Sequence, residues 1–247
     1  MDPVLDPERE RDELRAYLGD GYDEDRLRGW QRTLEEETEQ IGDEATLYRT
    51  SQAYLYNLTA FAMTGTKLPY LRALTRQVPA GGLLLDYGCG IGSDGLMLLE
   101  AGYRVAFADF DNPSTRYLRW RLERRGVDAP VYDLDRETVP SGFDGAYAFD
   151  VIEHVDDPFR FLGEMESRAR VVAVNLLEED PDDTSLHHTL PIGSLTEHAA
   201  HRTLLSYGRY HQGRSHLLVY SPAPSRGVRR LRSRARLLRG RLLPARG

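Results

Sequence analysis

The sequence has 247 residues, with 32 lysines and arginines against 39 aspartates and glutamates, so its formal net charge is −7. Hydrophobic residues make up 40% of the chain and charged residues 29%, which is ordinary for a folded domain and excludes a fibrous or fully disordered protein. No apolar stretch reaches the roughly 18 residues of a membrane span, and the acidic start lacks the apolar core of a signal peptide. A single cysteine, Cys89, excludes an internal disulfide. We therefore expect a cytoplasmic protein.

The charges are unevenly distributed along the chain. Residues 1–44 hold sixteen acids and six arginines, whereas residues 226–247 hold nine arginines and no acid. The acidic body repels a nucleic-acid backbone and the basic segment attracts one. Apolar residues in the basic segment recur every three or four positions, which fits an amphipathic helix able to lie on an anionic membrane or partner. They are Val228, Leu231, Ala235, Leu238 and Leu242. Gly240 weakens such a helix, and a disordered, solvated tail is the favoured prediction.

Helices are predicted before the first strand. Sparse apolar residues in 1–44 fit one or two surface helices with a narrow buried stripe. Apolar residues at helical spacing between Glu44 and Gly65 predict one better-buried helix, and a short helix follows over residues 69–77. Proline and glycine make residues 79–82 a loop.

From residue 83 onward, predicted strands alternate with predicted helices. This alternation is typical of an α/β fold whose mostly parallel sheet is covered by helices on both faces. Two final strands predict an antiparallel hairpin that completes a seven-stranded sheet. We expect a helical cap in 1–78, the α/β domain in 79–224 and an Arg-rich tail in 225–247. The strands are expected at 83–85, 104–108, 130–134, 143–149, 171–174, 203–207 and 216–220, and the helices at 94–101, 113–125 and 158–169.

A glycine-rich loop follows the first of these strands, with glycines at 88, 90 and 92. Glycines allow a sharp turn and a close approach to a ligand, and the next helix aims its free N–H groups at the loop. The segment also fits the dinucleotide pattern G-x-G-x-x-G. Asp86 favours a ligand with an ammonium or sulfonium group over a pyrophosphate. Asp109, at the end of the second strand, suits paired ribose hydroxyls.

Three segments, at residues 85–92, 102–109 and 143–158, resemble the ordered signatures of class I S-adenosylmethionine-dependent methyltransferases. The resemblance covers about residues 80–177. It implies a Rossmann-like fold and S-adenosyl-L-methionine as the cofactor, bound by the domain at 79–224.

The resemblance also implies roles for residues of this sequence. The glycine loop would line the methionine moiety, Asp86 would support its ammonium group, and Asp109 would hold the ribose. Phe110 would pack on the adenine. Asp133, with Leu134, would lie beside the adenine amino group, and Asp135 is the competing choice. The implied cofactor-binding residues are therefore Asp86, Gly88, Gly90, Gly92, Asp109, Phe110, Asp133 and Leu134.

Histidines are the candidates for catalysis, because a hydroxyl acceptor needs a base to remove its proton. Six of the seven histidines follow residue 186, where this family places acceptor-side elements. His187 and His188 are the first choice, although surface histidines also cluster by chance.

His154 is the third candidate and belongs to a second pattern. In a helix, Asp150, Glu153 and His154 would share one face, and carboxylates with an imidazole can bind a divalent metal. A similar element binds metal in small-RNA 2′-O-methyltransferases. The favoured alternative is that Glu153 and His154 hold the loop after the fourth strand.

These observations predict a methyltransferase that moves a methyl group from S-adenosyl-L-methionine to an oxygen or nitrogen of a small molecule. No Pro-Cys pair and no Asn-Pro-Pro-aromatic signature is present, which argues against DNA as the acceptor. One alternative is an RNA 2′-O-methyltransferase with a metal-assisted site and the Arg-rich tail as its electrostatic grip. A nicotinamide-dependent oxidoreductase and a non-catalytic relative that only binds the cofactor are the others.

Overall fold

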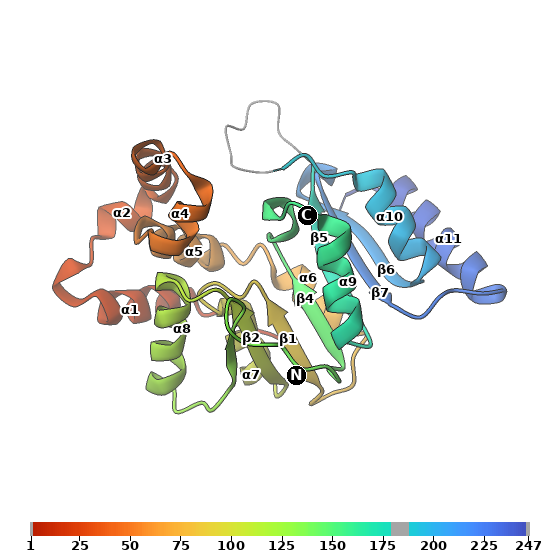
Figure 1. The fold of residues 1–247 in the computed structure, drawn as a ribbon, viewed down its shortest axis with the longest axis horizontal. Coiled ribbons are helices and arrows are strands. Elements are labelled where there is room, and N and C mark those ends of the chain that lie inside the picture. Colours follow the sequence, from red (N-terminus) through yellow and green to blue (C-terminus); the bar gives the residue numbers. More distant parts are fainter. Residues whose placement is uncertain (1, 179–187, 246–247) are drawn as a thin grey trace. The chain divides into compact units, whose positions relative to one another are not determined.

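The computed structural model describes residues 2–178 and 188–245, and the chain folds into two compact units. Unit 1 contains Met1–Leu71 and Gly88–Val139, and unit 2 contains Arg72–Tyr87 and Pro140–Gly247. Seven strands form a sheet in the order β3-β2-β1-β4-β5-β7-β6 (Figure 1). The strands are β1 Leu83–Tyr87, β2 Arg104–Asp109, β3 Val131–Asp133, β4 Gly145–Ala148, β5 Val172–Leu177, β6 Thr203–Tyr210 and β7 Ser215–Ser221.

The sheet confirms the predicted fold class. Strands β1, β4 and β5 pair in parallel, as do β2 and β3, whereas β7 pairs antiparallel with both β5 and β6. The central strands are buried along almost their whole length, as a sheet covered on both faces requires, and Asp86 and Asn175 are the polar side chains within β1 and β5 that are also buried. Strand β4 is shorter than predicted, because Phe143 forms only an isolated bridge with Ala169.

The helices of unit 1 share a hydrophobic core with the glycine loop. Leu14 and Leu55 from the first helices are buried against Ile91 and Tyr117. The helices are α1 Pro7–Leu18, α2 Glu24–Arg28, α3 Trp30–Ile41, α4 Glu44–Thr50, α5 Ala53–Met63, α7 Ser93–Glu100 and α8 Pro113–Arg124, with a 3-10 turn at Gly19–Gly21; α6, Leu68–Thr75, runs from unit 1 into unit 2.

The single helix predicted between Glu44 and Gly65 is wrong, because the chain breaks at Ser51. Ser51 has an extended backbone, and its hydroxyl accepts the Tyr54 N–H at 2.9 Å while donating to Glu37 Oε2 at 2.7 Å. Glu37 Oε2 also accepts the Ala53 N–H at 3.0 Å. Side-chain acceptors therefore satisfy the first N–H groups of α5, so a new helix starts there.

In unit 2, the basic segment forms helix α11, Val228–Leu242, against the edge strand β6 (Figure 1). Leu204 of β6 donates its N–H to Ser233 Oγ at 3.1 Å and accepts from Arg236 Nη1 at 3.0 Å. The helix thus satisfies backbone groups that an edge strand otherwise exposes. The other helical elements of this unit are η2 Ile152–His154, α9 Pro158–Arg168, α10 Ile192–His201 and η3 His211–Gly213.

None of the helices in residues 2–178 and 188–245 combines the length and the hydrophobicity that crossing a bilayer requires.

Candidate functional site

The glycine loop between β1 and α7 has a backbone that only glycine adopts easily. Gly88, Gly90 and Gly92 all have positive φ, at 79°, 51° and 72°. At Gly92 a Cβ atom would also lie 2.3 Å from Leu118 Cδ1, which is far inside van der Waals contact. A side chain is thus excluded at Gly92 for both conformational and steric reasons, and it is disfavoured at Gly88 and Gly90 by the backbone conformation. The loop presents bare backbone at the start of α7, where free N–H groups point outward.

Asp109, the last residue of β2, orients its carboxylate against this loop. Its Oδ2 accepts the Gly90 N–H at 2.8 Å, and its Oδ1 accepts the Phe110 N–H at 2.7 Å. Burial raises the pKa of Asp109, and the two N–H donors act in the opposite direction. The two N–H groups hold the carboxylate in place. Because Asp109 is only partly buried, a ligand can still reach it.

The end of β3 lies next to Asp109. Asp133 is the register partner of Asp109, and Leu134 donates its N–H to the Asp109 carbonyl at 3.0 Å. Asp133 is buried, whereas Asp135 is exposed. Asp133 and Asp135, the two choices for the position beside the adenine amino group, therefore have different environments.

Arg49 of α4 adds a cation that sequence reasoning missed. Its Nη1 lies 2.6 Å from Asp135 Oδ2, and its guanidinium lies over the Phe110 ring, 4.7 Å from the centroid. The pKa of Asp135 is lowered, chiefly by the hydrogen bond from Arg49. No sequence pattern marks one arginine among many on an exposed helix as the partner of a residue 86 positions away.

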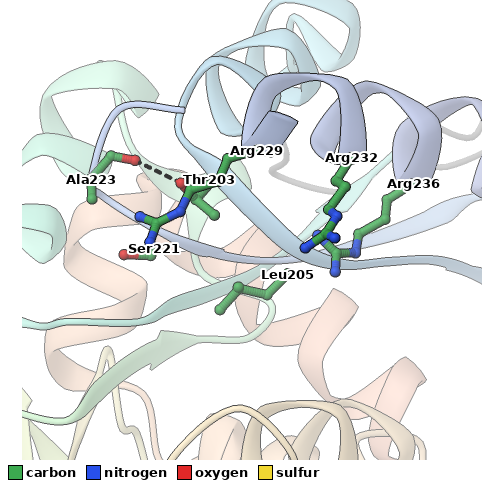
Figure 2. Close-up of a pocket in the computed structure, with 7 residues that line it drawn as sticks. All are labelled: Thr203, Leu205, Ser221, Ala223, Arg229, Arg232 and Arg236. Carbon is green, nitrogen blue, oxygen red and sulfur yellow. Dashed lines mark hydrogen bonds between the residues drawn. The ribbon is translucent and has the colours of Figure 1, made fainter. Parts of the chain in front are cut away.

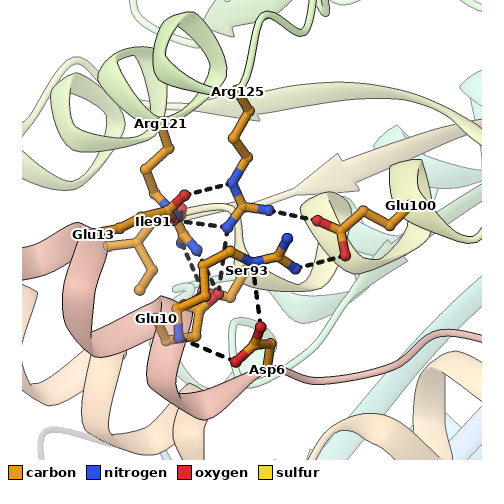
Figure 3. A network of polar contacts seen from close by, with 9 residues as sticks. Asp6, Glu10, Glu13, Ile91, Ser93, Glu100, Arg121 and Arg125 are labelled. Atoms are coloured by element: carbon orange, nitrogen blue, oxygen red, sulfur yellow. Dashed lines mark hydrogen bonds and ion pairs between the residues drawn. The ribbon is translucent and has the colours of Figure 1, made fainter.

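A buried network of ion pairs and hydrogen bonds, which the sequence also did not reveal, contacts the glycine loop through Ile91 and Ser93 (Figure 3). Arg121 of α8 is fully buried and donates to Glu13 Oε2 at 2.7 Å and to the Ile91 carbonyl at 3.0 Å. It also bonds Glu10 and the Ser93 hydroxyl. Burial acts to lower the pKa of Arg121, but the attraction of its acidic partners outweighs it and raises that pKa. The network joins α1, α8 and the glycine loop.

In unit 2, two acids lie at or beyond the carboxyl ends of strands. Asp86 belongs to β1 and is buried. Asp150 follows β4 and has a φ of 56°, a strained value for a residue other than glycine that is typical of functional sites. Its N–H donates to Asn175 Oδ1 at 2.8 Å, and Asn175 Nδ2 donates back to Asp150 Oδ1 at 2.6 Å. Asn175 is a buried amide on β5, which the predicted strand ended one residue too early to include.

The histidine candidates have different positions. His188 donates its N–H to the Glu153 carbonyl at 2.8 Å, so it lies against the segment that follows β4. Its side chain is half exposed, with Nε2 3.9 Å from Asp156 Oδ1. His154 ends η2 and is partly buried. His187 lies outside the described residues.

The helical face predicted for Asp150, Glu153 and His154 is wrong. Only residues 152–154 form a helical turn, of the 3-10 type, and the positive φ of Asp150 places it outside that turn. In the part of the chain that the structure describes, no three His, Cys, Asp or Glu side chains are grouped as metal ligands.

Comparisons with known proteins identify the family. A model described as "Methyltransferase domain" matches residues 65–219, which is more than half of the chain. The ribosomal protein L11 methyltransferase of Neisseria gonorrhoeae is 32% identical over 121 residues, 46% of this chain and 39% of that protein. Its counterpart from Neisseria meningitidis serogroup A is 31% identical over the same length. The chain therefore matches about two-fifths of the length of these curated relatives.

Solved structures share the fold. An S-adenosylmethionine-dependent methyltransferase from Clostridium acetobutylicum superposes with a TM-score of 0.54 at 9% identity, over 67% of this chain and 99% of that one. The PH0226 protein from Pyrococcus horikoshii has a TM-score of 0.52 at 16% identity, over 72% and 96% of the two chains. The fold and the glycine loop thus define a Rossmann-like protein of the class I methyltransferase type. The chain belongs to the methyltransferase domain family, and its cofactor is S-adenosyl-L-methionine.

Proposed function

We propose that this protein transfers the methyl group of S-adenosyl-L-methionine to an oxygen or nitrogen of a small-molecule acceptor. The observation that carries the proposal is the Asp109 carboxylate, fixed by two backbone N–H groups beside the glycine loop. When bound, the cofactor supplies a methyl group already activated by its sulfonium. The protein has to bind and orient the two reactants and exclude water.

The cofactor-binding roles follow from charge and shape. Asp109 accepts hydrogen bonds from the paired ribose hydroxyls, because its oxygens are already oriented by the loop. Gly88, Gly90 and Gly92 let the backbone approach the methionine moiety closely. Asp86, an acid at the end of β1, offsets the positive ammonium group. Phe110, which is 41% exposed, offers its ring to the adenine.

We assign the adenine amino group to Asp133 rather than to Asp135. The Asp135 carboxylate is engaged on both oxygens by Arg49, at 2.6 and 3.2 Å. Asp133 is buried next to Asp109 in the register of β2 and β3. The Asp133 Oδ1 accepts the Asp135 N–H at 3.0 Å, and its Oδ2 lies 3.6 Å from Nε of the exposed Arg136, a longer contact than either that Arg49 makes with Asp135. A buried carboxylate with this looser ion pair gains more from a ligand N–H than an exposed one bonded by a cation on both oxygens.

On the acceptor side, His188 is the base we propose for a hydroxyl acceptor. Its imidazole is half exposed. Among the described residues, the carboxylate oxygen recorded beside the ring is Asp156 Oδ1, 3.9 Å from Nε2. The ring therefore remains available to a substrate proton. An acidic chain outside residues 226–247 favours a small acceptor over a polyanion. The relatives named ribosomal protein L11 methyltransferases make a protein the second candidate acceptor.

The donor half of the proposal is tested by calorimetry with S-adenosylhomocysteine. Asp109→Asn should weaken binding about 5- to 150-fold, because about 1–3 kcal/mol of charge-assisted hydrogen bonding is lost. Asp111→Asn is the matched control, since that acid is bonded to Arg116 on the surface, and it should bind like the wild type. Wild-type affinity in Asp109→Asn, or binding of a nicotinamide nucleotide instead, would overturn the donor assignment.

The acceptor half is tested by transfer of a labelled methyl group to a panel of small molecules, to RNA and to ribosomal protein. We expect labelled small molecules. On the acceptor found, His188→Ala should lower kcat while leaving the affinity for S-adenosylhomocysteine unchanged, and His201→Ala, an exposed histidine on α10, should change neither. Tight cofactor binding with no transfer to any acceptor would contradict the enzymatic proposal and favour a cofactor-binding regulator.

A further inference from the structure

Helix α11 has two apolar faces, and only one of them is used by the fold. Ser233, Leu237 and Gly240 are buried against unit 2. Gly240 is required for this packing, because a Cβ there would lie 2.2 Å from Tyr207 Cδ1. The buried face of the helix is therefore made of small residues and one leucine.

The second apolar face is the stripe that the sequence spacing predicts, and it points to solvent. Its large members are exposed by 64%, 70%, 58% and 84%, in the order Val228, Leu231, Leu238 and Leu242. In a helix of 3.6 residues per turn these positions lie on the side opposite Ser233, Leu237 and Gly240. We call this surface the outer stripe. Exposed leucines at this density on one face mark an interaction site.

Arginines border the outer stripe on both sides. By the same helical geometry, Arg232 and Arg239 lie on one side and Arg234 and Arg241 on the other. The segment contains no acid, and among residues 2–178 and 188–245 no carboxylate forms an ion pair with any arginine of α11. The positive charge of this surface is therefore not neutralised within the described part of the chain.

Arg232, at one side of the outer stripe, also lines a pocket between α11 and the edge of the sheet (Figure 2). Arg229, Arg232 and Arg236 line it together with Thr203 and Ser221. Guanidinium groups donate hydrogen bonds to phosphate oxygens. The Thr203 hydroxyl is already engaged, because it donates to the Ala223 carbonyl at 3.0 Å. The surface thus combines phosphate-binding groups with an apolar stripe on the same helix.

We propose that α11 binds the surface of an anionic lipid bilayer, with the outer stripe among the upper acyl chains and the arginines on the lipid phosphates. This is the arrangement of an interfacial helix, whose apolar face is buried to the depth of the headgroup boundary while cationic side chains stay at the surface. RNA would use the arginines but would leave the outer stripe in water, so a bilayer accounts for both features. The inference does not depend on the proposed enzymatic activity.

The test is co-sedimentation of the full-length protein with vesicles of phosphatidylcholine containing phosphatidylglycerol. We expect binding to these vesicles that weakens as salt is raised, and at least tenfold weaker binding to vesicles of phosphatidylcholine alone. The variant Leu231→Ser/Leu238→Ser/Leu242→Ser keeps every arginine and should bind anionic vesicles at least tenfold more weakly than the wild type. Because these leucines face away from the fold, its thermal unfolding should be unchanged.

Two further variants make the result specific. Arg232→Gln/Arg234→Gln/Arg239→Gln keeps the outer stripe and should also lose at least tenfold in vesicle binding, whereas Val4→Ser, an exposed apolar residue outside α11, should bind normally. The proposal is overturned if the leucine variant binds anionic vesicles as the wild type does. It is equally overturned if the protein binds a single-stranded RNA and not the vesicles, since the occupant would then be a nucleic acid.

Discussion

Gly92 does two separate things in the glycine loop, and a substitution can tell them apart. Its φ of 72° is a conformation that side-chain-bearing residues rarely adopt, and its Cα lies against the Leu118 side chain. Gly102 has a similar φ of 89°, with no atom within 4 Å of a Cβ placed there. The two glycines therefore share the backbone conformation and differ in the space around it.

We predict that Gly102→Ala lowers the free energy of unfolding by about 1–2 kcal/mol, the cost of a left-handed residue with a Cβ. Gly92→Ala should lower it by about 1–3 kcal/mol more, because the new methyl group overlaps Leu118. Urea unfolding measures both. Adding Leu118→Ala to Gly92→Ala should cost less than the sum of the two single changes; equal losses in the two glycine variants would refute the steric part.

Helix α1 is fixed to the rest of unit 1 by charge as well as by its apolar residues. Glu10 and Glu13 are buried, and they are bonded by Arg121 of α8 and by Arg125, which caps the end of that helix. A buried pair of this kind adds little net stability, but removing one partner leaves the other charge without compensation.

Arg121→Met should therefore lower the free energy of unfolding by about 3–5 kcal/mol. Arg116→Met on the same helix removes an exposed ion pair with Asp111 and should cost less than about 1 kcal/mol. Denaturant unfolding followed by circular dichroism distinguishes the two. Similar small losses in both variants would mean that the network is not a structural link.

Acid sensitivity of the whole molecule follows from the same network. Burial acts to raise the pKa of Glu13, but hydrogen bonds and attraction from Arg125 and Arg121 outweigh it, and the pKa lies below its ordinary value of 4.5. Since the folded state binds this proton less tightly than the unfolded state, Glu13 contributes stability above pH 4.5. That contribution is lost as the pH falls through the lower, folded pKa.

We predict that the wild type unfolds at higher urea than Glu13→Gln at pH 7, and that the gap narrows as the pH is lowered from 4.5 toward 3. Glu36→Gln, an exposed acid on α3, serves as the control and should follow the wild type at every pH. A gap that stays constant over this range would contradict the assignment of the lowered pKa to Glu13.

The sequence allowed prediction of the features that depend on local pattern. Alternating strands and helices gave the sheet, and the positions of Gly88–Gly92 and Asp109 gave the loop and its carboxylate. What remained hidden depends on partners far away in the chain. In the sequence, Arg121 looks like an ordinary surface arginine. Its burial depends on Glu10 and Glu13, which lie more than a hundred positions earlier and meet it only in the folded chain.

The same limit applies to the elements that were wrongly predicted. The break at Ser51 requires Glu37 to reach the start of α5, which helical periodicity does not reveal. Residues 228–242 form helix α11, whereas the favoured prediction for this segment is a disordered tail. The apolar spacing fits a helix, but spacing alone does not say which face of that helix packs on the fold. On the packed face, position 240 has to be glycine, because a Cβ there would lie 2.2 Å from Tyr207 Cδ1.

Arg121 also carries a consequence for anyone who wishes to shorten or recombine this protein. Its guanidinium donates one hydrogen bond to the Ile91 carbonyl of the loop and others to the carboxylates of Glu10 and Glu13. A truncated chain starting at residue 79 would lose both of these acids, and it would expose Ile91 and Tyr117, which the removed helices cover. A chimera that contains residues 79–224 of this chain must therefore also contain the first eighteen residues, which include α1. Otherwise Arg121 has to be replaced by an uncharged side chain of similar length.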